Sequence, residues 1–247
     1  MRCVTTVKTA WLRCGLASAL ACCVGFVYAQ ASAQASAQVN TPQQAPDLTL
    51  LVTHTAVSNG VDGIKRTSEF SERITRSTGN VWIARVLPAA AHAEHAHGKA
   101  GGKLEKDHKH LDVSTASRWL ARDATGALQM RLVPNDEKVI VQVSQTDYGN
   151  IGFDGSWSAS WSLIDPAKLK QMKAGPTVGD LTSYTKAEKG GQIKVVWNNQ
   201  LQIPVSVVSS DGTSRRETVV KSTGAPSTKP WEKLQGYTFK DYSDYLD

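Results

Sequence analysis

The sequence predicts a mainly β protein with an antiparallel sheet and two or three short helices. Runs rich in β-branched residues recur along the chain and are separated by turn sequences. Several turns join consecutive runs directly, which favours hairpins over alternating βαβ units. Helical periodicity is confined to the middle of the chain. We therefore expect one sheet into which the helices are inserted.

Residues 1–29 are predicted to be a cleavable secretory signal peptide. Arg2, Lys8 and Arg13 come before an apolar run at 14–29, and no acidic residue intervenes. This run is shorter than the roughly 20 residues that a membrane-spanning helix requires. Small residues near Ala29 offer more than one cleavage position. The sequence therefore predicts export from the cytoplasm, with no transmembrane segment in the mature chain.

The cysteines share one location, because all of them lie inside this predicted signal: Cys3, Cys14, Cys22 and Cys23. The mature chain is therefore expected to have neither a disulfide framework nor a reactive thiol. Lipid attachment at Cys22, which follows an Ala-Leu-Ala sequence, is the alternative to cleavage and release. It would anchor the protein to a membrane.

Residues 30–46 are predicted to be a disordered polar lead, and residues 47–247 a single domain. About 200 residues are enough for one hydrophobic core. The chain has 28 basic and 22 acidic residues, and three of the basic ones lie in the signal, which leaves a net charge of +3. That charge is ordinary, and no basic stripe interleaved with aromatic residues is present. We therefore expect no nucleic-acid partner.

The strands are predicted from alternation and turn chemistry. Expected strands lie at 48–57, 64–77, 81–87, 128–133, 138–144, 193–197, 205–208 and 215–220. One face of the second strand carries Phe70, Glu72, Ile74 and Arg76. The Asp-Gly sequence at 211–212, between two alternating runs, is a strong hairpin signal.

The first helix is predicted after Asp154, whose side chain can cap it. Trp157, Trp161 and Ile164 recur at helical spacing and should share one face. Residues 113–122 are a weaker helical candidate.

A second helix is predicted to begin at Asp165-Pro166, because proline suits the first helical position. Gly175 can end this helix. Leu169 and Met172 would be its buried residues.

The succession of elements after residue 193 resembles a known family. Ile193-Lys194-Val195-Val196-Trp197 is followed by a polar turn, by Ile203-Pro204-Val205, by a strand, and by Asp211-Gly212 before another strand. This order is similar to that of the periplasmic outer-membrane lipoprotein carriers (LolA-like) and of the related sensors that regulate envelope-stress sigma factors. The earlier hairpin, from Glu72 through Gly79 to Trp82, is also similar to early strands of that superfamily.

The resemblance implies a strongly curved antiparallel sheet, or half-barrel, with the helices across its concave face. It also implies a non-catalytic periplasmic binding protein of outer-membrane biogenesis. Its partner would be a lipid, a lipoprotein or an inner-membrane protein. The candidate cavity or lid residues are Trp157, Trp161, Ile164, Leu169 and Met172. The alternative, which we favour for the two tryptophans, is that they form the packed side of an ordinary helix.

The segment at 89–110 departs from the family and is predicted to be a flexible histidine-rich insertion. It holds His92, His95, His97, His108 and His110. On an extended backbone residues i and i+2 point the same way, so each His-x-His pair could hold zinc or copper. An envelope metal-handling role is therefore the alternative function. The alternative to a metal site is a solvated loop rich in Ala, Gly and Lys that binds no metal.

No catalytic motif supports an enzyme. Ser183 and Lys186 match an S-x-x-K spacing, but the accompanying elements of serine acyl-enzymes are missing. His54 lies alone in an apolar run and is interpreted as a satisfied core residue. The aromatic C-terminal residues, from Trp231 to Tyr245, are expected either to close the core or to form a partner-binding stripe, and we favour closure.

Overall fold

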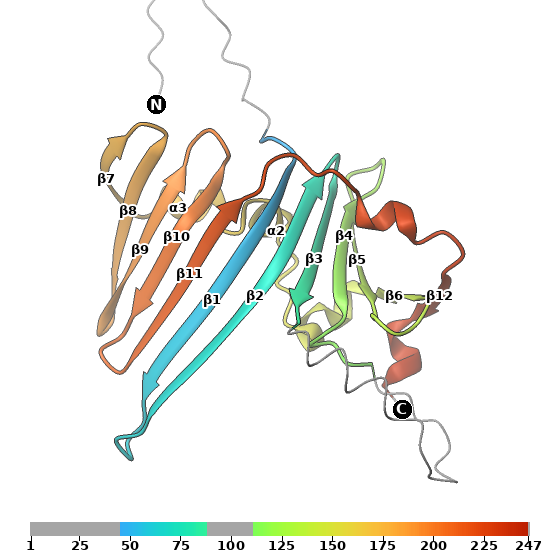
Figure 1. Ribbon diagram of the computed structural model, residues 1–247, viewed down its shortest axis with the longest axis horizontal. Helices are drawn as coiled ribbons and strands as arrows, with labels where there is room; N and C mark the ends of the chain where they lie inside the picture. Colours follow the sequence, from blue (N-terminus) through green and yellow to red (C-terminus); the bar gives the residue numbers. More distant parts are fainter. Residues whose placement is uncertain (1–44, 88–110, 247) are drawn as a thin grey trace, which may run out of the picture. The chain divides into compact units, whose positions relative to one another are not determined.

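The structure is a computed structural model and describes residues 45–87 and 111–246. These residues belong to one compact unit. The predicted signal peptide, nearly all of the predicted polar lead and the histidine-rich segment lie outside the described residues. The described strands form one sheet in the order β12-β6-β5-β4-β3-β2-β1-β11-β10-β9-β8-β7 (Figure 1).

The strands are β1 Leu48–Asn59, β2 Lys65–Ser77, β3 Asn80–Val86, β4 Ser117–Arg122, β5 Leu128–Val133, β6 Val139–Val143, β7 Lys173–Val178, β8 Leu181–Glu188, β9 Gly191–Asn198, β10 Ile203–Ser210, β11 Ser214–Ser222 and β12 Thr238–Asp241. The helices are η1 Gln145–Ile151, α2 Trp157–Ser162, α3 Pro166–Leu169, η2 Pro230–Lys233 and η3 Tyr242–Tyr245.

The chain builds the sheet in two passes. Strands β1 to β6 run outward as consecutive antiparallel neighbours, and the chain then crosses back through η1, α2 and α3. Strands β7 to β11 return as a second antiparallel series, so that β11 pairs with the free edge of β1. The predicted antiparallel pairing is correct for β1 to β11, whereas β12 pairs with β6 in parallel.

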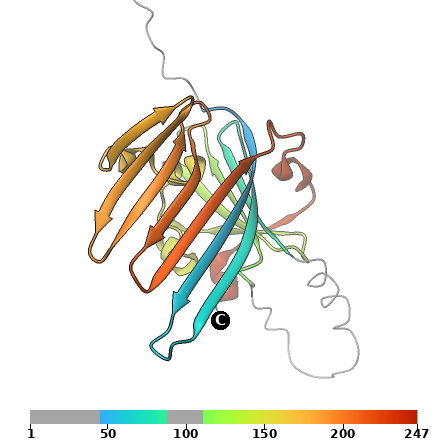
Figure 2. The same cartoon turned by 60° about the vertical axis from the view of Figure 1, so that its left-hand side comes forward.

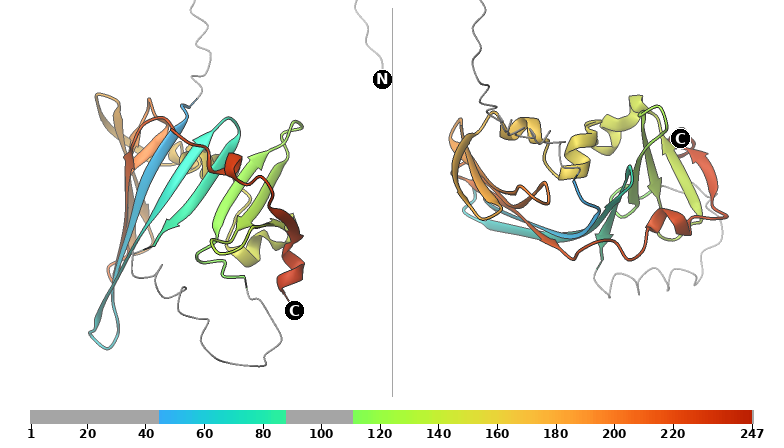
Figure 3. Two further views of the ribbon diagram at one scale, coloured as in Figure 1. Left: turned by 45° about the vertical axis from the view of Figure 1, so that its right-hand side comes forward. Right: turned by 90° about the horizontal axis from the view of Figure 1, so that it is seen from above.

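The sheet is strongly curved, as predicted. Strands β7 to β11 follow this bend (Figure 2), and the segment from η1 to α3 lies across the concave side (Figure 3). Sheets twist by themselves, and register shifts between β9 and β10 and between β7 and β8 add local bending. The half-barrel with short helices over its hollow face is confirmed.

Three details differ from the predictions. Residues 117–122 form strand β4 and no helix, because Leu120 faces the concave core while its neighbour Trp119 packs on the other face. Alternation of period two therefore decides this segment. Strands β7 and β8 were not expected, and β7 begins before Gly175, where the second helix was predicted to end.

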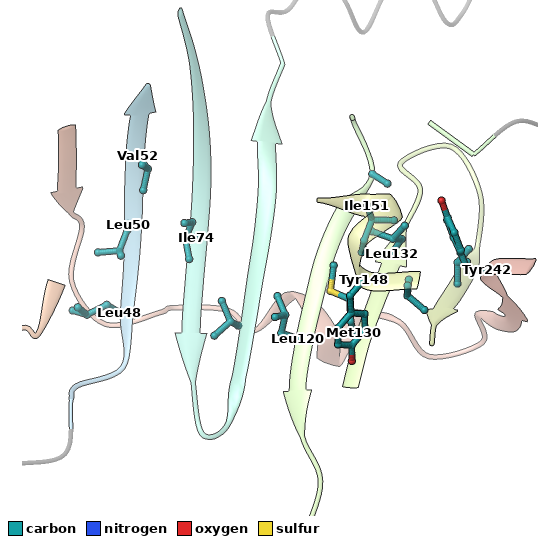
Figure 4. Close-up of a cluster of buried hydrophobic side chains, with 14 of the residues drawn as sticks. Leu48, Leu50, Val52, Ile74, Leu120, Met130, Leu132, Tyr148, Ile151 and Tyr242 are labelled. Carbon is teal, nitrogen blue, oxygen red and sulfur yellow. The ribbon is translucent and has the colours of Figure 1, made fainter. Parts of the chain in front are cut away.

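The main core lies on the concave face and is called the concave core (Figure 4). It contains Leu50, Leu120, Met130, Leu132 and Val141, all at most 1% exposed. As expected, every second residue of β6 joins it, namely Val139, Val141 and Val143. Tyr242 from η3 closes this core at the β12 end.

A second cluster on the convex face is formed by Trp82, Val133 and Ile140. The C-terminal segment packs over it with three large side chains, Trp231, Leu234 and Tyr237. Most of the C-terminal aromatic residues therefore close cores, as favoured from the sequence. Phe239 on β12 is the exception, since it is 63% exposed. Trp119 also packs against this cluster, beside Trp82.

Candidate functional site

The candidate site is a cavity of about 280 Å³ between the concave face and the α2–α3 segment. Its sheet wall is mostly apolar, with Val52, Ile74, Ile83, Pro204 and Val207. Ala159, Ser160, Leu163 and Ile164 cover it from the helical side. At one end the wall becomes polar, with His54, Glu72 and Thr218.

The cavity lies where two groups of packed side chains do not meet. Val52 and Ile74 belong to the concave core, whereas Ile164 and Val207 pack against a smaller cluster of Leu169, Val195 and Trp197. We call this cluster the α3 cluster. Because α2 and α3 are only six and four residues long, they cover the hollow face incompletely. Part of the apolar wall of the cavity is therefore not covered by the chain's own side chains.

The N-cap of helix α2 lies two residues after the predicted one. Ser156, whose hydroxyl accepts a hydrogen bond from the Ala159 amide at 3.2 Å, is the N-cap, while Asp154 accepts from the Ser156 amide. The helix ends at Leu163, whose φ of 64° is left-handed. Such a backbone is uncommon for a side chain of this size. Ile164 therefore does not continue the tryptophan face of the helix, contrary to the prediction.

Arg76 of β2 anchors the end of α2. Its guanidinium donates to the carbonyl of Trp161 at 2.6 Å, to that of Leu201 at 2.6 Å and to that of Pro46 at 3.0 Å. The side chain is fully buried, and this burial lowers the pKa of Arg76 to about 10, although the charge of Asp47 acts in the opposite direction. Three carbonyls from separate segments thus satisfy one buried cation.

The two tryptophans of α2 pack as a pair. Their rings stack with centroids 5.4 Å apart, and both lie against the concave core. Arg76 lies 5.2 Å from the Trp161 ring centroid, and Arg122 lies 4.8 Å from that of Trp157. These cation–π contacts fix the face of α2 that turns toward the sheet. Neither tryptophan lines the cavity itself.

The remaining predicted site residues belong to the α3 segment. Asp165 caps α3 through the Ala167 amide at 3.0 Å, as expected, and Pro166 occupies the first turn. Leu169 is buried and Met172 partly buried, both in the α3 cluster. Of the five predicted residues, only Ile164 touches the cavity. The others form the support of its cover.

The polar end of the cavity was missed by the sequence interpretation. His54 on β1 contacts Glu72 on β2 with Nε2 and Oε2 3.4 Å apart, and its Nδ1 lies 3.1 Å from the Thr218 hydroxyl on β11. Its hydrogen-bonding groups are satisfied, as expected, but the side chain is 31% exposed and lines the cavity. The prediction of a core residue was therefore wrong. The alternation of β1 places His54 after Leu50 and Val52 on one face, which was the available signal.

The other sequence candidates find no support as sites in the part of the chain that the structure describes. Ser183 and Lys186 lie three residues apart on β8, so they face opposite sides of the sheet. Residues 45–87 and 111–246 contain no group of three potential metal ligands. The five histidines predicted to bind metal fall outside these ranges. None of the described helices combines the length and apolar character of a membrane span.

Comparison with solved structures returns proteins of the superfamily that the sequence resembles. A LolA superfamily protein from Nitrosomonas europaea matches with 6% identity over 75% of this chain and 89% of its own, at a TM-score of 0.32. A putative outer-membrane lipoprotein-sorting domain from Vibrio parahaemolyticus matches with 11% identity over 72% and 87%, at 0.29. A chain of the Pseudomonas aeruginosa MucA/MucB complex matches with 13% identity over 76% and 55%, at 0.28.

No protein-family model and no curated protein matches the sequence. Because these TM-scores all lie below 0.5, the fold rests on the strand order and curvature described above, and the site rests on its own geometry.

Proposed function

We propose that this protein is a non-catalytic periplasmic binding protein. It holds an apolar ligand, or the lipid chain of a lipidated or membrane-anchored partner, in the cavity of the half-barrel. The observation that carries this proposal is the apolar wall of Val52, Ile74 and Val207, which the short helices leave unfilled. Burial of an acyl chain there is favourable by about 0.8 kcal/mol per CH₂ group.

The size of the cavity fits part of one chain. Its volume of about 280 Å³ lies just below the roughly 300–1,000 Å³ that is usual for small-molecule pockets. A larger ligand requires α2 to move away from the sheet. Isolated helices shorter than about 12 residues are marginal in water, so α2 depends on its contacts with Arg76 and on its packed tryptophans. Its displacement would remove Ala159 and Ser160 from the cavity wall and enlarge the cavity.

Native mass spectrometry of the mature protein with added lipids tests this function. We expect one bound lipid in the wild type and loss of uptake in Val207→Phe, which fills the cavity. Val208→Phe is the matched control, because Val208 is the next residue of β10 and faces the other side of the sheet. Detection of only ligand-free wild-type protein would overturn the proposal.

A second candidate function is metal handling by the segment at 89–110. The observation in its favour is the presence of two His-x-His pairs, at 95/97 and 108/110. Calorimetric titration with Zn²⁺ and Cu²⁺ tests it, and a double His95→Ala and His108→Ala variant should bind more weakly. If the affinity of this variant equals that of the wild type, the metal role is wrong.

A further inference from the structure

The polar end of the cavity continues into a stack of side chains on the concave face. The His54 and Phe70 rings stack with centroids 4.7 Å apart, and the Arg85 guanidinium lies 3.7 Å from the Phe70 centroid. The three residues come from β1, β2 and β3, and β2 lies between the other two strands. Phe70 therefore separates the imidazole from the guanidinium.

The carboxylate nearest to this stack is already engaged. Glu72 is the register partner of Arg85, yet it contacts His54 at 3.4 Å instead. Arg85 stacks on Phe70, and no carboxylate pairs with it among residues 45–87 and 111–246. A guanidinium stacked through its face keeps its in-plane N–H groups free to bind oxygen atoms.

A second arginine lies on the same face. Arg216 is two residues from Thr218 on β11 and pairs in register with Ala56 of β1. Because side chains alternate along a strand, Arg216 shares the concave face with Thr218 and His54. Its side chain is exposed. The positions around His54 on the concave face thus carry two arginines and a single carboxylate, Glu72, which leaves an excess of positive charge.

The change from apolar to basic wall is abrupt. Along β1 it takes one step on the concave face, from Val52 to His54, and along β2 one step, from Ile74 to Glu72. Arg85 is level with Glu72, but its guanidinium reaches Phe70, which is the register partner of His54. Arg216 lies one concave-face position beyond His54, on the neighbouring strand β11. An occupant with its tail against Val52 and Ile74 therefore has its other end beside these two arginines.

We infer that the cavity selects anionic amphiphiles, whose carboxylate or phosphate head is bound by Arg85 and Arg216 while the alkyl tail lies along the apolar wall. This inference rests on the proposed function and names its ligand class. The Phe70 ring holds Arg85 in place, and His54 engages Glu72, which lines the same end of the cavity. Because the arginines are exposed, the preference for anions should weaken as ionic strength rises.

Calorimetric titration with three probes of equal tail length tests the inference: dodecanoate, dodecyl phosphate and neutral monododecanoylglycerol, all below their aggregation concentrations. We expect the wild type to bind at least one anionic probe about tenfold more tightly than the neutral one, which corresponds to about 1.4 kcal/mol. In a double Arg85→Gln and Arg216→Gln variant this preference should fall to about one, with neutral binding unchanged. The carboxylate and phosphate probes separate the two possible heads.

The matched control is Arg73→Gln with Lys221→Gln, which removes the same charge from the convex face of β2 and β11. Its anion preference should equal that of the wild type. Equal binding of all three probes by the wild type would overturn the head-group inference and leave the proposed function intact. An equal loss of preference in the control would show a general charge effect and would also overturn the inference. Absence of binding by any probe would remove the proposed function as well.

Discussion

Strands β4–β6 and strands β7–β9 lie toward opposite ends of the sheet and are covered to very different extents. On β6 the concave core buries Val141, and the convex cluster buries the neighbouring Ile140. On β7 every residue is exposed. Among the described residues, the α3 cluster, with Leu169, Val195 and Trp197, is the one buried cluster on the second wing. The first wing, β4–β6, is thus filled from both faces. The second wing, β7–β9, has little cover, and the adjoining strand β10 supplies part of the cavity wall.

This difference shows how the half-barrel combines stability with an unfilled hollow. The first wing, β4–β6, acts as the packed part of the molecule. The second wing, β7–β9, is held mainly by its ladder to β10 and by α3. The cavity lies between the cores of the two wings, and Arg76 ties both sides to α2.

The largest effect on the free energy of unfolding is expected at Arg76. Arg76→Ala should destabilise the protein by about 3–5 kcal/mol, because it leaves the carbonyls of Pro46, Trp161 and Leu201 without their buried donor. The free energy of unfolding in urea, compared between this variant and the wild type, measures the loss. Arg73→Ala on the same strand is exposed and should change stability by less than about 0.5 kcal/mol. Similar values for the two variants would mean that Arg76 is no anchor.

The two wings should respond differently to the loss of a buried leucine. Leu132→Ala in the concave core should cost about 3–4 kcal/mol, and Leu169→Ala about 2 kcal/mol. The cavity at Leu132 cannot relax because both faces of β5 are covered, whereas the four-residue α3 can settle toward the sheet. Thermal and urea unfolding of both variants compare them. A larger loss at Leu169 would contradict the assignment of the packed wing.

A smaller, pH-dependent effect is expected at the β10–β11 turn. Hydrogen bonds from the Ser214 hydroxyl and amide and from Thr213 lower the pKa of Asp211 to about 2. The unfolded carboxyl titrates near 3.8, so the ionised form stabilises the fold above that pH and this contribution is lost as pH falls through about 2. Asp211→Asn should lower the Tm at pH 7, and the difference from wild type should vanish near pH 2. A constant difference between these pH values would contradict this account.

The smallest effect is expected for Phe239→Ser. Phe239 is 63% exposed on β12, so its removal from the edge of the first wing should change stability by less than about 0.5 kcal/mol. Tyr242→Ala, three residues later and buried in the concave core, should cost several times more. Comparable losses in urea unfolding would mean that Phe239 contributes to packing.

The strand plan could be predicted because local signals determine it. Asp211 shows why: its side chain binds the amides of Thr213 and Ser214, so the turn is encoded within four residues. The two faces of β6 follow in the same way from its alternation. The end of α2 was not predictable from spacing, because it depends on the left-handed backbone of Leu163. Ile164 was placed on the wrong face for that reason.

The site was less predictable because it joins distant segments. Arg76 could be placed on a face of β2, but its acceptors are backbone carbonyls. Because every residue has a backbone carbonyl, the sequence does not indicate which ones Arg76 binds. His54 looked like a core residue because it lies in a largely apolar strand, after Leu50 and Val52. Its role depends on Glu72 and Thr218, which β2 and β11 bring beside it. Only the complete order of strands reveals this.

The position of β1 between β2 and β11 also governs when the molecule can be assembled. The ladder between β1 and β11 pairs Leu50 with Ser222, near the other end of the domain. This ladder therefore cannot form until β11 is present. Closure over so long a stretch of chain is slow, and until then a twelve-residue strand presents an open edge to other polypeptides. Folding must therefore follow synthesis of nearly the whole chain, and any fragment that ends before β11 will tend to self-associate.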